Sequence, residues 1–183
     1  HYKAAEMTAK YHLLVDFHGS YKPTGLNRTY PNVINFEGVH GLEQQKFADS
    51  SIDQVTYDVT IPFIRQLAGP MDYTQGAMRN ATKENFAPVY SEPMSQGTRC
   101  RQLAQYVVFE SPLNMLCDSP SNYMKEEECT KYIATVPTVW DTTISLAGEI
   151  GKYVAIARKS GEDWYSGAMT NWDSRTIEID FSF

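Results

Sequence analysis

The sequence is poor in basic residues and contains no long apolar run. Its 16 Lys and Arg are outnumbered by 22 Asp and Glu, which gives a net charge of −6 and a pI near 5.2. A nucleic-acid-binding surface needs a basic stripe, so no nucleic-acid partner is expected. No stretch approaches the roughly 18 consecutive apolar residues of a membrane helix, and the first ten residues lack the apolar core of a signal peptide. We therefore expect no membrane partner.

Cysteine is also scarce. Cys100, Cys117 and Cys129 are 17 and 12 positions apart, a spacing that matches no CxxC metal or redox motif. The spacing favours buried structural thiols, although one disulfide with a leftover thiol stays open in an oxidising compartment.

What the sequence does contain is enough apolar residues, 42% of 183, for a sizeable core in one domain or slightly more. Short apolar runs alternate with helical patterns four times, which predicts a parallel sheet with crossover helices. The chain begins directly in a helical pattern, so we expect it to be part of something longer. The predicted strands are 11–17, 33–36, a short run ending at residue 72, and 113–117, and the predicted helices are 1–10, 57–67, 99–110 and one that begins after residues 118–120.

The pattern changes after Val136–Pro137. The runs PTVWDTTISL, GKYVAIARKS, DWYSGAMTNW and RTIEIDFSF alternate apolar and polar residues and are separated by tight turns. Such runs predict an antiparallel hairpin module. We therefore place a domain boundary here, with one domain over 1–136 and a second over 137–183.

Each predicted parallel strand ends in or near an acid, namely Asp16, Glu37, Asp72 and Asp118. Parallel strands share one direction, so their C-terminal ends, and these carboxylates, should meet at one rim. Asp118 could instead cap the following helix, and Asp72 could simply open a turn. Asp16 is harder to explain structurally, because a carboxylate that closes an apolar strand needs a partner or a function.

Two glutamates, Glu37 and Glu43, lie six positions apart across a loop with Gly38 and Gly41. They share a site only if this loop folds back, which the glycines permit. Paired carboxylates suit glycoside cleavage, and they also suit Ca²⁺, which takes several carboxylate oxygens.

Zinc is not indicated by the histidines. His12, His18 and His40 form no HxH or HExxH arrangement. They are interpreted as hydrogen-bonded or sugar-contacting side chains.

Several segments together resemble glycoside hydrolase family 97, a family of bacterial exo-acting α-glycosidases. They are VDFHG (15–19), KPTGLNRTYPN (22–32), FEGVHGLE (36–43), AGPMDYTQGAM (68–78), PTVWDTT (137–143) and GAMTNW (167–172). The resemblance implies an N-terminal β-sandwich, a (β/α)8 catalytic barrel and a C-terminal β-module. This chain would be α/β in class, with units 5–8 of a TIM barrel, that is its second half, followed by an incomplete antiparallel β-sandwich module. The upstream half of the enzyme would be its partner.

The resemblance also implies roles for individual residues. Glu43 matches the general acid or acid/base, and Glu37 matches a Ca²⁺ ligand, with Glu43 close to the ion. His18 matches a sugar-contacting histidine, and Lys22 lies in the loop that lines the pocket. Asp16, on a neighbouring rim position, is predicted to bind sugar.

Gly19 favours one of the two branches that the resemblance allows, the retaining one. Inverting α-glucosidases of the family carry a glutamate base directly after the histidine, where this sequence has Gly19. The retaining branch uses an aspartate nucleophile from the fourth barrel strand, which would lie upstream of His1. The isolated chain is therefore predicted to be inactive.

The expected function is that of a calcium-dependent retaining α-galactosidase acting on terminal sugars of oligosaccharides or glycosides in a bacterial periplasm. One alternative is an inverting α-glucosidase of the same family. Another is a non-catalytic carbohydrate-binding or structural piece, in which Trp140, Trp164 and Trp172 supply the function. The linkage cleaved and the oligomeric state do not follow from the sequence.

Overall fold

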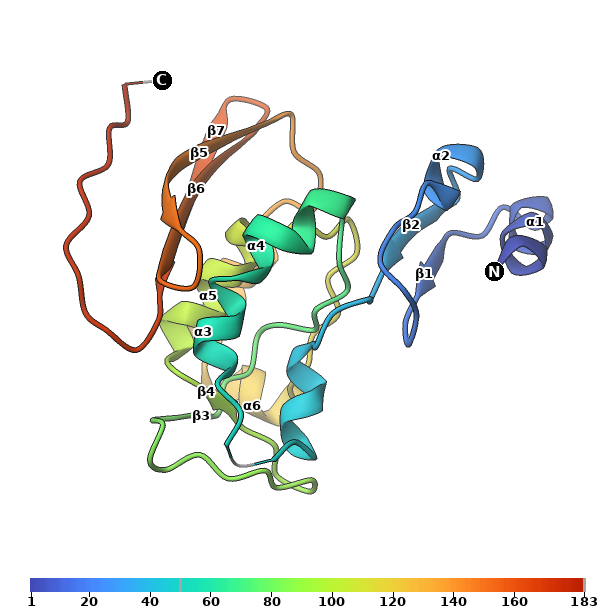
Figure 1. Ribbon diagram of the computed structural model, residues 1–183. Helices are drawn as coiled ribbons and strands as arrows, with labels where there is room; N and C mark the ends of the chain where they lie inside the picture. The colour runs from blue at the N-terminus through green and yellow to red at the C-terminus, as the bar shows by residue number, and fades with distance from the viewer. Residues whose placement is uncertain (50, 183) are drawn as a thin grey trace.

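The computed structural model describes residues 1–49 and 51–182 (Figure 1). An N-terminal group of short elements lies at one end of the molecule, and a three-stranded sheet lies at the other, with helices between them. The elements are α1 (Tyr2–Lys10), β1 (Val15–Phe17), α2 (Leu26–Thr29), β2 (Val33–Phe36), η1 (Leu42–Lys46), α3 (Gln54–Asp58), α4 (Ile61–Ile64), η2 (Gln66–Ala68), β3 (Asn80–Ala81), β4 (Ser95–Gln96), α5 (Arg99–Val108), α6 (Pro120–Lys125), α7 (Glu127–Thr135), β5 (Thr142–Glu149), β6 (Tyr153–Ser160) and β7 (Asp163–Thr170).

The N-terminal group contains a parallel pair, β1 and β2, as predicted. Asp16 is opposite Asn35 in this pair, and Phe17 is opposite Phe36. Ala5 of α1 and Val33 of β2 share a small buried cluster with Phe36. The predicted strand 11–17 is shorter than expected, because residues 11–12 form a turn and Leu13 and Leu14 are exposed.

Two further predicted strands are not strands in the described chain. Residues 70–73 have no assigned secondary structure but pass beside the end of β2, with the Asp72 N–H donating to Phe36 O and the Met71 N–H to Glu110 O. Pro70 has no N–H to give to a ladder. Residues 113–117 instead follow a turn in which the Ser111 hydroxyl donates to Leu113 O. A local side-chain bond of this kind competes with strand pairing.

The predicted helix 57–67 is divided into the last turns of α3, then α4 and η2. Asp53 caps α3 by accepting from the Thr56 N–H, and α4 begins after Thr60 with Pro62 in its first turn. Pro62 has no N–H to continue the α3 bonding pattern, so a new helix begins there. The predicted helices at 1–10, at 99–110 and after residue 118 are confirmed within two residues.

The C-terminal hairpin module is confirmed over three strands. β5, β6 and β7 form an antiparallel sheet in that order. The fourth predicted strand, RTIEIDFSF, is wrong for residues 175–182, which are extended without a partner strand in the part of the chain described; residue 183 lies outside it. Alternating residues predict an extended backbone, but a ladder also needs a neighbour with free N–H and C=O groups.

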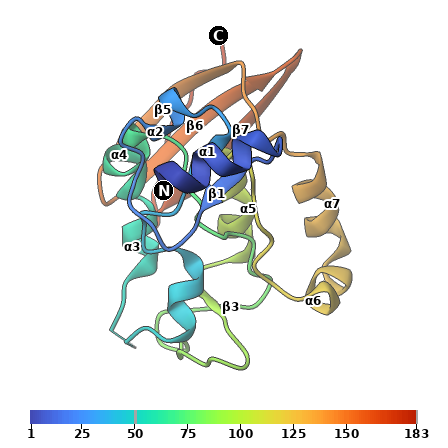
Figure 2. The same ribbon diagram turned by 90° about the vertical axis from the view of Figure 1, so that its right-hand side faces the viewer.

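Helix α5 packs on the sheet and joins the two parts of the chain. A Cβ on Gly167 of β7 would approach Val107 Cβ at 2.9 Å, so the absence of a side chain permits this contact. Arg158 of β6 is 1% exposed and donates to the carbonyls of Val107 and Val108. Figure 2 shows α6 and α7 at the edge of this assembly, beyond α5.

Candidate functional site

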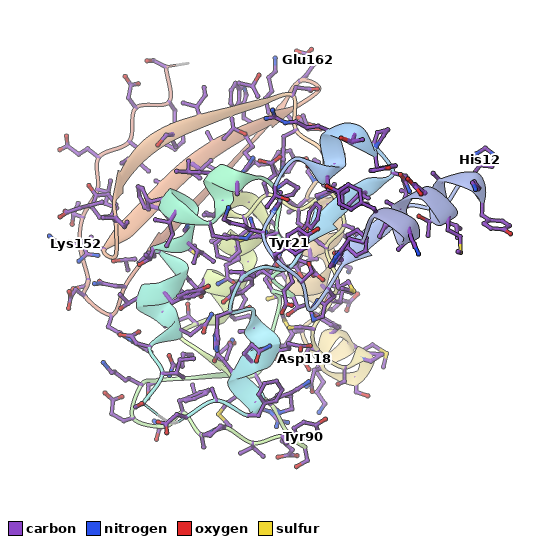
Figure 3. All side chains as sticks on the ribbon, turned by 45° about the vertical axis from the view of Figure 1, so that its right-hand side comes forward. His12, Tyr21, Tyr90, Asp118, Lys152 and Glu162 are labelled. Carbon is purple, nitrogen blue, oxygen red and sulfur yellow. The ribbon has the colours of Figure 1, made fainter. Side chains whose placement is uncertain are left out.

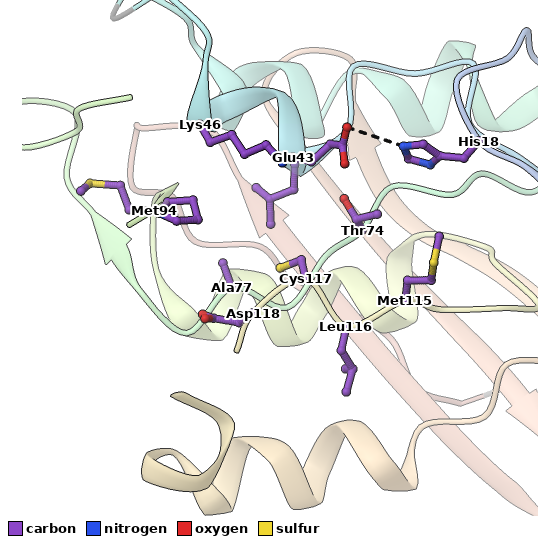
Figure 4. Close-up of a pocket in the computed structure, with 12 residues that line it drawn as sticks. His18, Glu43, Lys46, Thr74, Ala77, Met94, Met115, Leu116, Cys117 and Asp118 are labelled. Atoms are coloured by element: carbon purple, nitrogen blue, oxygen red, sulfur yellow. Dashed lines mark ion pairs between the residues drawn. The ribbon is translucent and has the colours of Figure 1, made fainter. Parts of the chain in front are cut away.

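A cavity of about 390 Å³ opens beside the ends of β1 and β2 (Figure 4). His18 follows β1, Glu43 and Lys46 come from η1, and Thr74 follows the segment that passes beside the end of β2. The remaining lining residues are Leu42, Ala77, Pro93, Met94, Met115, Leu116, Cys117 and Asp118. One wall therefore carries the ionisable side chains of His18, Glu43 and Lys46, and the opposite wall is largely apolar.

His18 is the centre of the polar wall. Its Nδ1 lies 2.7 Å from Asp72 Oδ2, and its Nε2 lies 3.6 Å from Glu43 Oε1 and 3.7 Å from Glu37 Oε1. Burial lowers the pKa of His18, but the hydrogen bond to Asp72 and the charges of Glu37 and Glu43 raise it more, so the net shift is upward. Two of the four predicted rim carboxylates, Glu37 and Asp72, thus meet Glu43 around one imidazole.

Glu37 is nearly buried, and the backbone of two glycines accommodates it. Its Oε2 accepts a hydrogen bond of 2.6 Å from the Gly19 N–H, while Oε1 faces His18. Gly38 has φ +46°, and a Cβ there would lie 2.2 Å from Lys22 N, so only glycine fits this turn. The chain can therefore fold back from Glu37 toward Glu43, as the sequence predicted.

Arg65 holds the loop that follows β2 in place by hydrogen bonds to its backbone. This buried guanidinium donates to the carbonyls of Phe36, Glu37 and Gly38 at 2.9–3.1 Å. It also donates to the carbonyls of Gly69 and Pro70, both at 3.0 Å. One side chain thus joins the segment that carries Glu37 to the segment that leads to Asp72.

Asp16 and Asp72 lie together behind His18 and away from the cavity lining. The Asn35 side chain donates to Asp16 Oδ2 at 3.3 Å. Burial, together with the negative charge of Asp72, raises the pKa of Asp16 to about 6. Asp16 therefore contacts protein groups in this structure, and its predicted contact with sugar stays a prediction.

Lys22 and Asp118 occupy different positions relative to the cavity. Lys22 is exposed and is not a lining residue, although its backbone packs against Gly38. Asp118 lines the cavity, but its oxygens accept from the backbone N–H groups of Met78 and Ser119. Ser119, rather than Asp118, is the cap of α6.

The other histidines are separate from the site. His12 lies at the far end of the N-terminal group and is exposed (Figure 3). His40 Nδ1 lies 3.2 Å from Gln54 Oε1, in agreement with its interpretation as a hydrogen-bonded side chain.

Sequence reasoning missed three residues of the site. Thr74 has φ +62°, which is unusual for a β-branched residue, and its buried Oγ1 has no hydrogen-bond partner among the described residues. No sequence signal indicates such a backbone. Lys46 lies three positions after Glu43 on η1, and that helical spacing could have identified it. Arg65 lies within the predicted helix 57–67, and nothing in the sequence indicated that its side chain binds the loop of Glu37.

No helix in the described part of the chain is long and apolar enough to cross a membrane.

Within the described residues, no group of three or more His, Cys, Asp or Glu side chains has the arrangement of a metal site. Glu37 Oε1 and Glu43 Oε1 nevertheless face the same imidazole nitrogen. Carboxylate oxygens are the donors that Ca²⁺ prefers, and Ca²⁺ takes six to eight of them. The two glutamates therefore fit part of a calcium site.

Two family models match the ends of the chain. The model described as "Glycoside hydrolase 97" matches residues 1–39, which include His18 and Glu37. The model described as "Glycosyl-hydrolase 97 C-terminal, oligomerisation" matches residues 139–183, which contain the β5–β7 sheet. The chain belongs to glycoside hydrolase family 97.

Relatives match the chain over nearly its whole length. It is 68% identical over 182 residues to a retaining alpha-galactosidase from Bacteroides thetaiotaomicron and 33% identical over 172 residues to a probable retaining alpha-galactosidase from Streptomyces bingchenggensis. These alignments cover 100% and 94% of this chain but only 28% and 25% of the relatives. The chain thus spans about a quarter of the length of the curated relatives it matches.

Solved structures of family 97 enzymes have the same fold. An enzyme from Pseudoalteromonas sp. strain K8, solved in complex with panose and with acarbose, matches with a TM-score of 0.83 and 34% identity over 97% of this chain and 28% of that one. A beta-arabinopyranosidase matches with a TM-score of 0.78 and 28% identity over 91% of this chain and 26% of that one. The three-stranded sheet fits the C-terminal domain of the family.

These matches confirm the resemblance to family 97 that the sequence segments indicated. Trp140 packs edge-on against Tyr165 with ring centroids 5.4 Å apart, and Trp172 donates to Asp53. In this family 97 chain both side chains therefore have structural partners. The three cysteines are free, as one of the two open interpretations expected, but the predicted burial is wrong: Cys100 is exposed, and Cys117 and Cys129 are partly exposed.

Proposed function

We propose that this chain is part of a retaining α-galactosidase that hydrolyses terminal α-linked galactose from oligosaccharides or glycosides. The observation that carries the proposal is the 68% identity over 182 residues to a retaining alpha-galactosidase, in an alignment that covers the whole chain. The site itself supports it, because acids and a histidine face one cavity large enough for a sugar ring.

Glu43 is the acid/base of this proposal. Its side chain is 37% exposed and lines the cavity, and its Oε1 lies 3.6 Å from His18 Nε2 (Figure 4). From this position it can deliver a proton to the oxygen of a departing group and later take a proton from the attacking water. His18, which is also partly exposed, is positioned to contact a sugar hydroxyl.

The nucleophile of a retaining reaction must lie about 5–5.5 Å from the acid/base. Within the described residues, the neighbouring rim acids are already engaged: Asp72 binds His18, and Asp118 binds backbone N–H groups. We therefore propose that an upstream aspartate supplies the nucleophile. In this arrangement residues 1–136 are the second half of a (β/α)8 barrel, and 137–183 belong to a C-terminal β-sandwich module.

Calcium is proposed as the cofactor, held by Glu37 and Glu43 together with ligands from upstream sequence. The Gly19 N–H binds Glu37 Oε2, and Oε1 accepts from no backbone N–H within residues 1–49 and 51–182. When bound, the ion would supply positive charge beside the acid/base. We also propose a bacterial periplasmic location, which rests on the family resemblance and is testable by cell fractionation.

An inverting α-glucosidase is the second candidate, because one solved relative carries panose and acarbose. Against it, this chain has Gly19 where the inverting branch has a glutamate base, and Gly19 has φ +62°, a conformation that disfavours a side chain. A non-catalytic carbohydrate-binding role is less supported, because Trp140 and Trp172 have structural partners.

Substrate selectivity tests the proposal. The protein that carries this chain together with its upstream sequence should hydrolyse an aryl α-galactoside with a kcat/KM at least tenfold above that for the matching α-glucoside. A preference for the α-glucoside would favour the second candidate, and no turnover of either would favour the non-catalytic one.

A further inference from the structure

A lysine and two aromatic rings lie together at one end of the cavity. Lys46 of η1 lines the cavity, and its Nζ lies 5.5 Å from the ring centroid of Phe47 and 5.4 Å from that of Tyr90. Tyr90 belongs to the segment between β3 and β4, from which Pro93 and Met94 also line the cavity. We call Lys46, Phe47 and Tyr90 the aromatic corner.

The aromatic corner is open to solvent. Tyr90 is 72% exposed and Phe47 is 52% exposed, so neither ring belongs to the core. Among the described residues, Lys46 Nζ contacts these two rings but has no carboxylate partner and no hydrogen-bond acceptor. An ammonium group has three donors. The corner therefore presents aromatic faces and N–H donors beside the cavity.

The segment between β3 and β4 is tied to η1, which fixes the two sides of the corner. The Gln96 N–H of β4 donates at 3.0 Å to Oε1 of Gln45, a residue of η1 that is 1% exposed. At the start of the segment, Arg79 pairs with the Glu92 carboxylate at 3.3 Å and donates to the Glu92 carbonyl. The lysine and the tyrosine are thus held close together by the backbones that carry them.

The position of the corner relative to Glu43 indicates which part of a substrate it meets. Figure 4 shows Glu43 between His18 on one side and Lys46 and Met94 on the other. In the proposed reaction, Glu43 delivers a proton to the oxygen that joins galactose to its leaving group, and the galactose ring lies toward His18. The leaving group therefore extends toward Lys46.

A sugar ring suits the chemistry of this end of the cavity. It has an apolar C–H face that packs on an aromatic ring, and hydroxyl groups that accept hydrogen bonds from an ammonium. Pro93 and Met94 add apolar surface beside the lysine. Asp118 lines the same cavity and repels an anionic ligand, so a neutral sugar is favoured over one that carries a carboxylate.

We propose that Lys46, Phe47 and Tyr90 form a subsite for the leaving-group sugar, so that the substrate is a galactosyl oligosaccharide whose second ring is a neutral hexose. The proposal rests on the proposed function, because it assigns the leaving-group side of the same cavity. Contacts to this second ring contribute to kcat/KM although the ring itself does not react.

The test compares two substrates of the protein that carries this chain with its upstream sequence. One is galactosyl-glucose, taken as whichever of its α-1,3, α-1,4 and α-1,6 isomers has the highest kcat/KM. The other is α-galactosyl fluoride, whose leaving group is a single atom. Tyr90→Ala and Lys46→Met should each lower kcat/KM for the disaccharide at least about tenfold and change that for the fluoride less than about twofold.

Three variants control the result. Tyr90→Phe keeps the ring and should behave as wild type on both substrates. Tyr11→Ala removes a tyrosine that is also 72% exposed but lies next to His12, at the far end of the N-terminal group (Figure 3). Lys131→Met removes an exposed lysine of α7 that pairs with Glu127. Neither of these two should change the ratio of the two kcat/KM values.

A second measurement does not depend on turnover. The sulfur-linked analogue of the disaccharide resists hydrolysis, and its Kd, measured by isothermal titration calorimetry, should rise at least about fivefold in Tyr90→Ala and in Lys46→Met. The tyrosine is mostly exposed, so its loss leaves the core intact.

Where the protein turns over the fluoride, a wild-type ratio of the two kcat/KM values in both variants, or no turnover of any of the disaccharides, would overturn the subsite and leave the proposed function standing. Where the protein turns over no galactoside, the proposed function fails, and the Kd decides the subsite. A Kd that rises in both variants would support it, and an unchanged Kd or no binding would overturn it.

Discussion

At the scale of single residues, Glu43 carries the most direct chemical expectation. It is the partly exposed acid of the cavity, so it can reach a leaving group. Glu43→Ala should reduce turnover of galactosides with poor leaving groups by 10²-fold or more, because only these need a proton delivered. Activated aryl galactosides should be affected much less, and azide should restore product as a galactosyl azide of retained configuration. Equal losses on both substrate types would argue against this role.

Asp16 makes a second residue-scale prediction, about stability and pH. Its pKa is raised from 3.8 to about 6, so the folded protein holds this proton more tightly than the unfolded chain. The stabilisation is complete below pH 3.8 and is lost as the pH rises through about 6. The group is half-buried and screened by water, so we expect a loss of at most about 2 kcal/mol.

The measurement is urea unfolding between pH 4 and pH 7. Asp16→Asn should flatten the dependence over this range, whereas Asp163→Asn, an exposed carboxyl at the start of β7, should not. An identical slope in Asp16→Asn and wild type would remove Asp16 as the cause.

At the scale of elements, Arg65 is the link between the loop of Glu37 and the segment of Asp72. It makes hydrogen bonds to five carbonyl oxygens. A lysine has three donors on a flexible stem and cannot span both segments. Arg65→Lys should lower the free energy of unfolding by about 2–4 kcal/mol, because buried carbonyls lose their donors. Arg28→Lys, at an exposed position, is the matched control, and equal stabilities of the two variants would contradict this account.

Elements also show how far sequence reasoning reached. The helices at 1–10 and 99–108, the β1–β2 pair and the β5–β7 hairpins follow from periodicity and turn residues. The strands expected at 113–117 and 175–183 were not found in the residues described, since a ladder depends on which backbone lies alongside. Periodicity does not report that neighbour.

The contacts of the site likewise divide into those that the sequence predicted and those that it did not. The meeting of Glu37 and Glu43 was predictable from a strand end and the glycines between them, and His18 was added to the site by the family resemblance. The contact of Asp72 with His18 joins residues 54 positions apart, and the role of Arg65 depends on carbonyl directions. Both need the folded backbone, as does the positive φ of Thr74.

At the scale of the whole molecule, the two glutamates of this chain are part of a proposed calcium site. EGTA should abolish the activity of the protein with its upstream sequence, and added Ca²⁺ should restore it, because the ion neutralises carboxylates that otherwise repel one another. Glu37→Gln should raise the Ca²⁺ concentration needed for half-maximal activity at least tenfold. Full activity in EGTA would exclude the cofactor.

The retaining mechanism is the central claim about the whole molecule, and the configuration of the first product tests it most directly. Proton NMR during early hydrolysis of an aryl α-galactoside, before mutarotation, resolves the two anomers of released galactose. The account predicts that α-galactose appears first, since two inversions at the anomeric carbon restore its configuration. β-Galactose as the first product would contradict it.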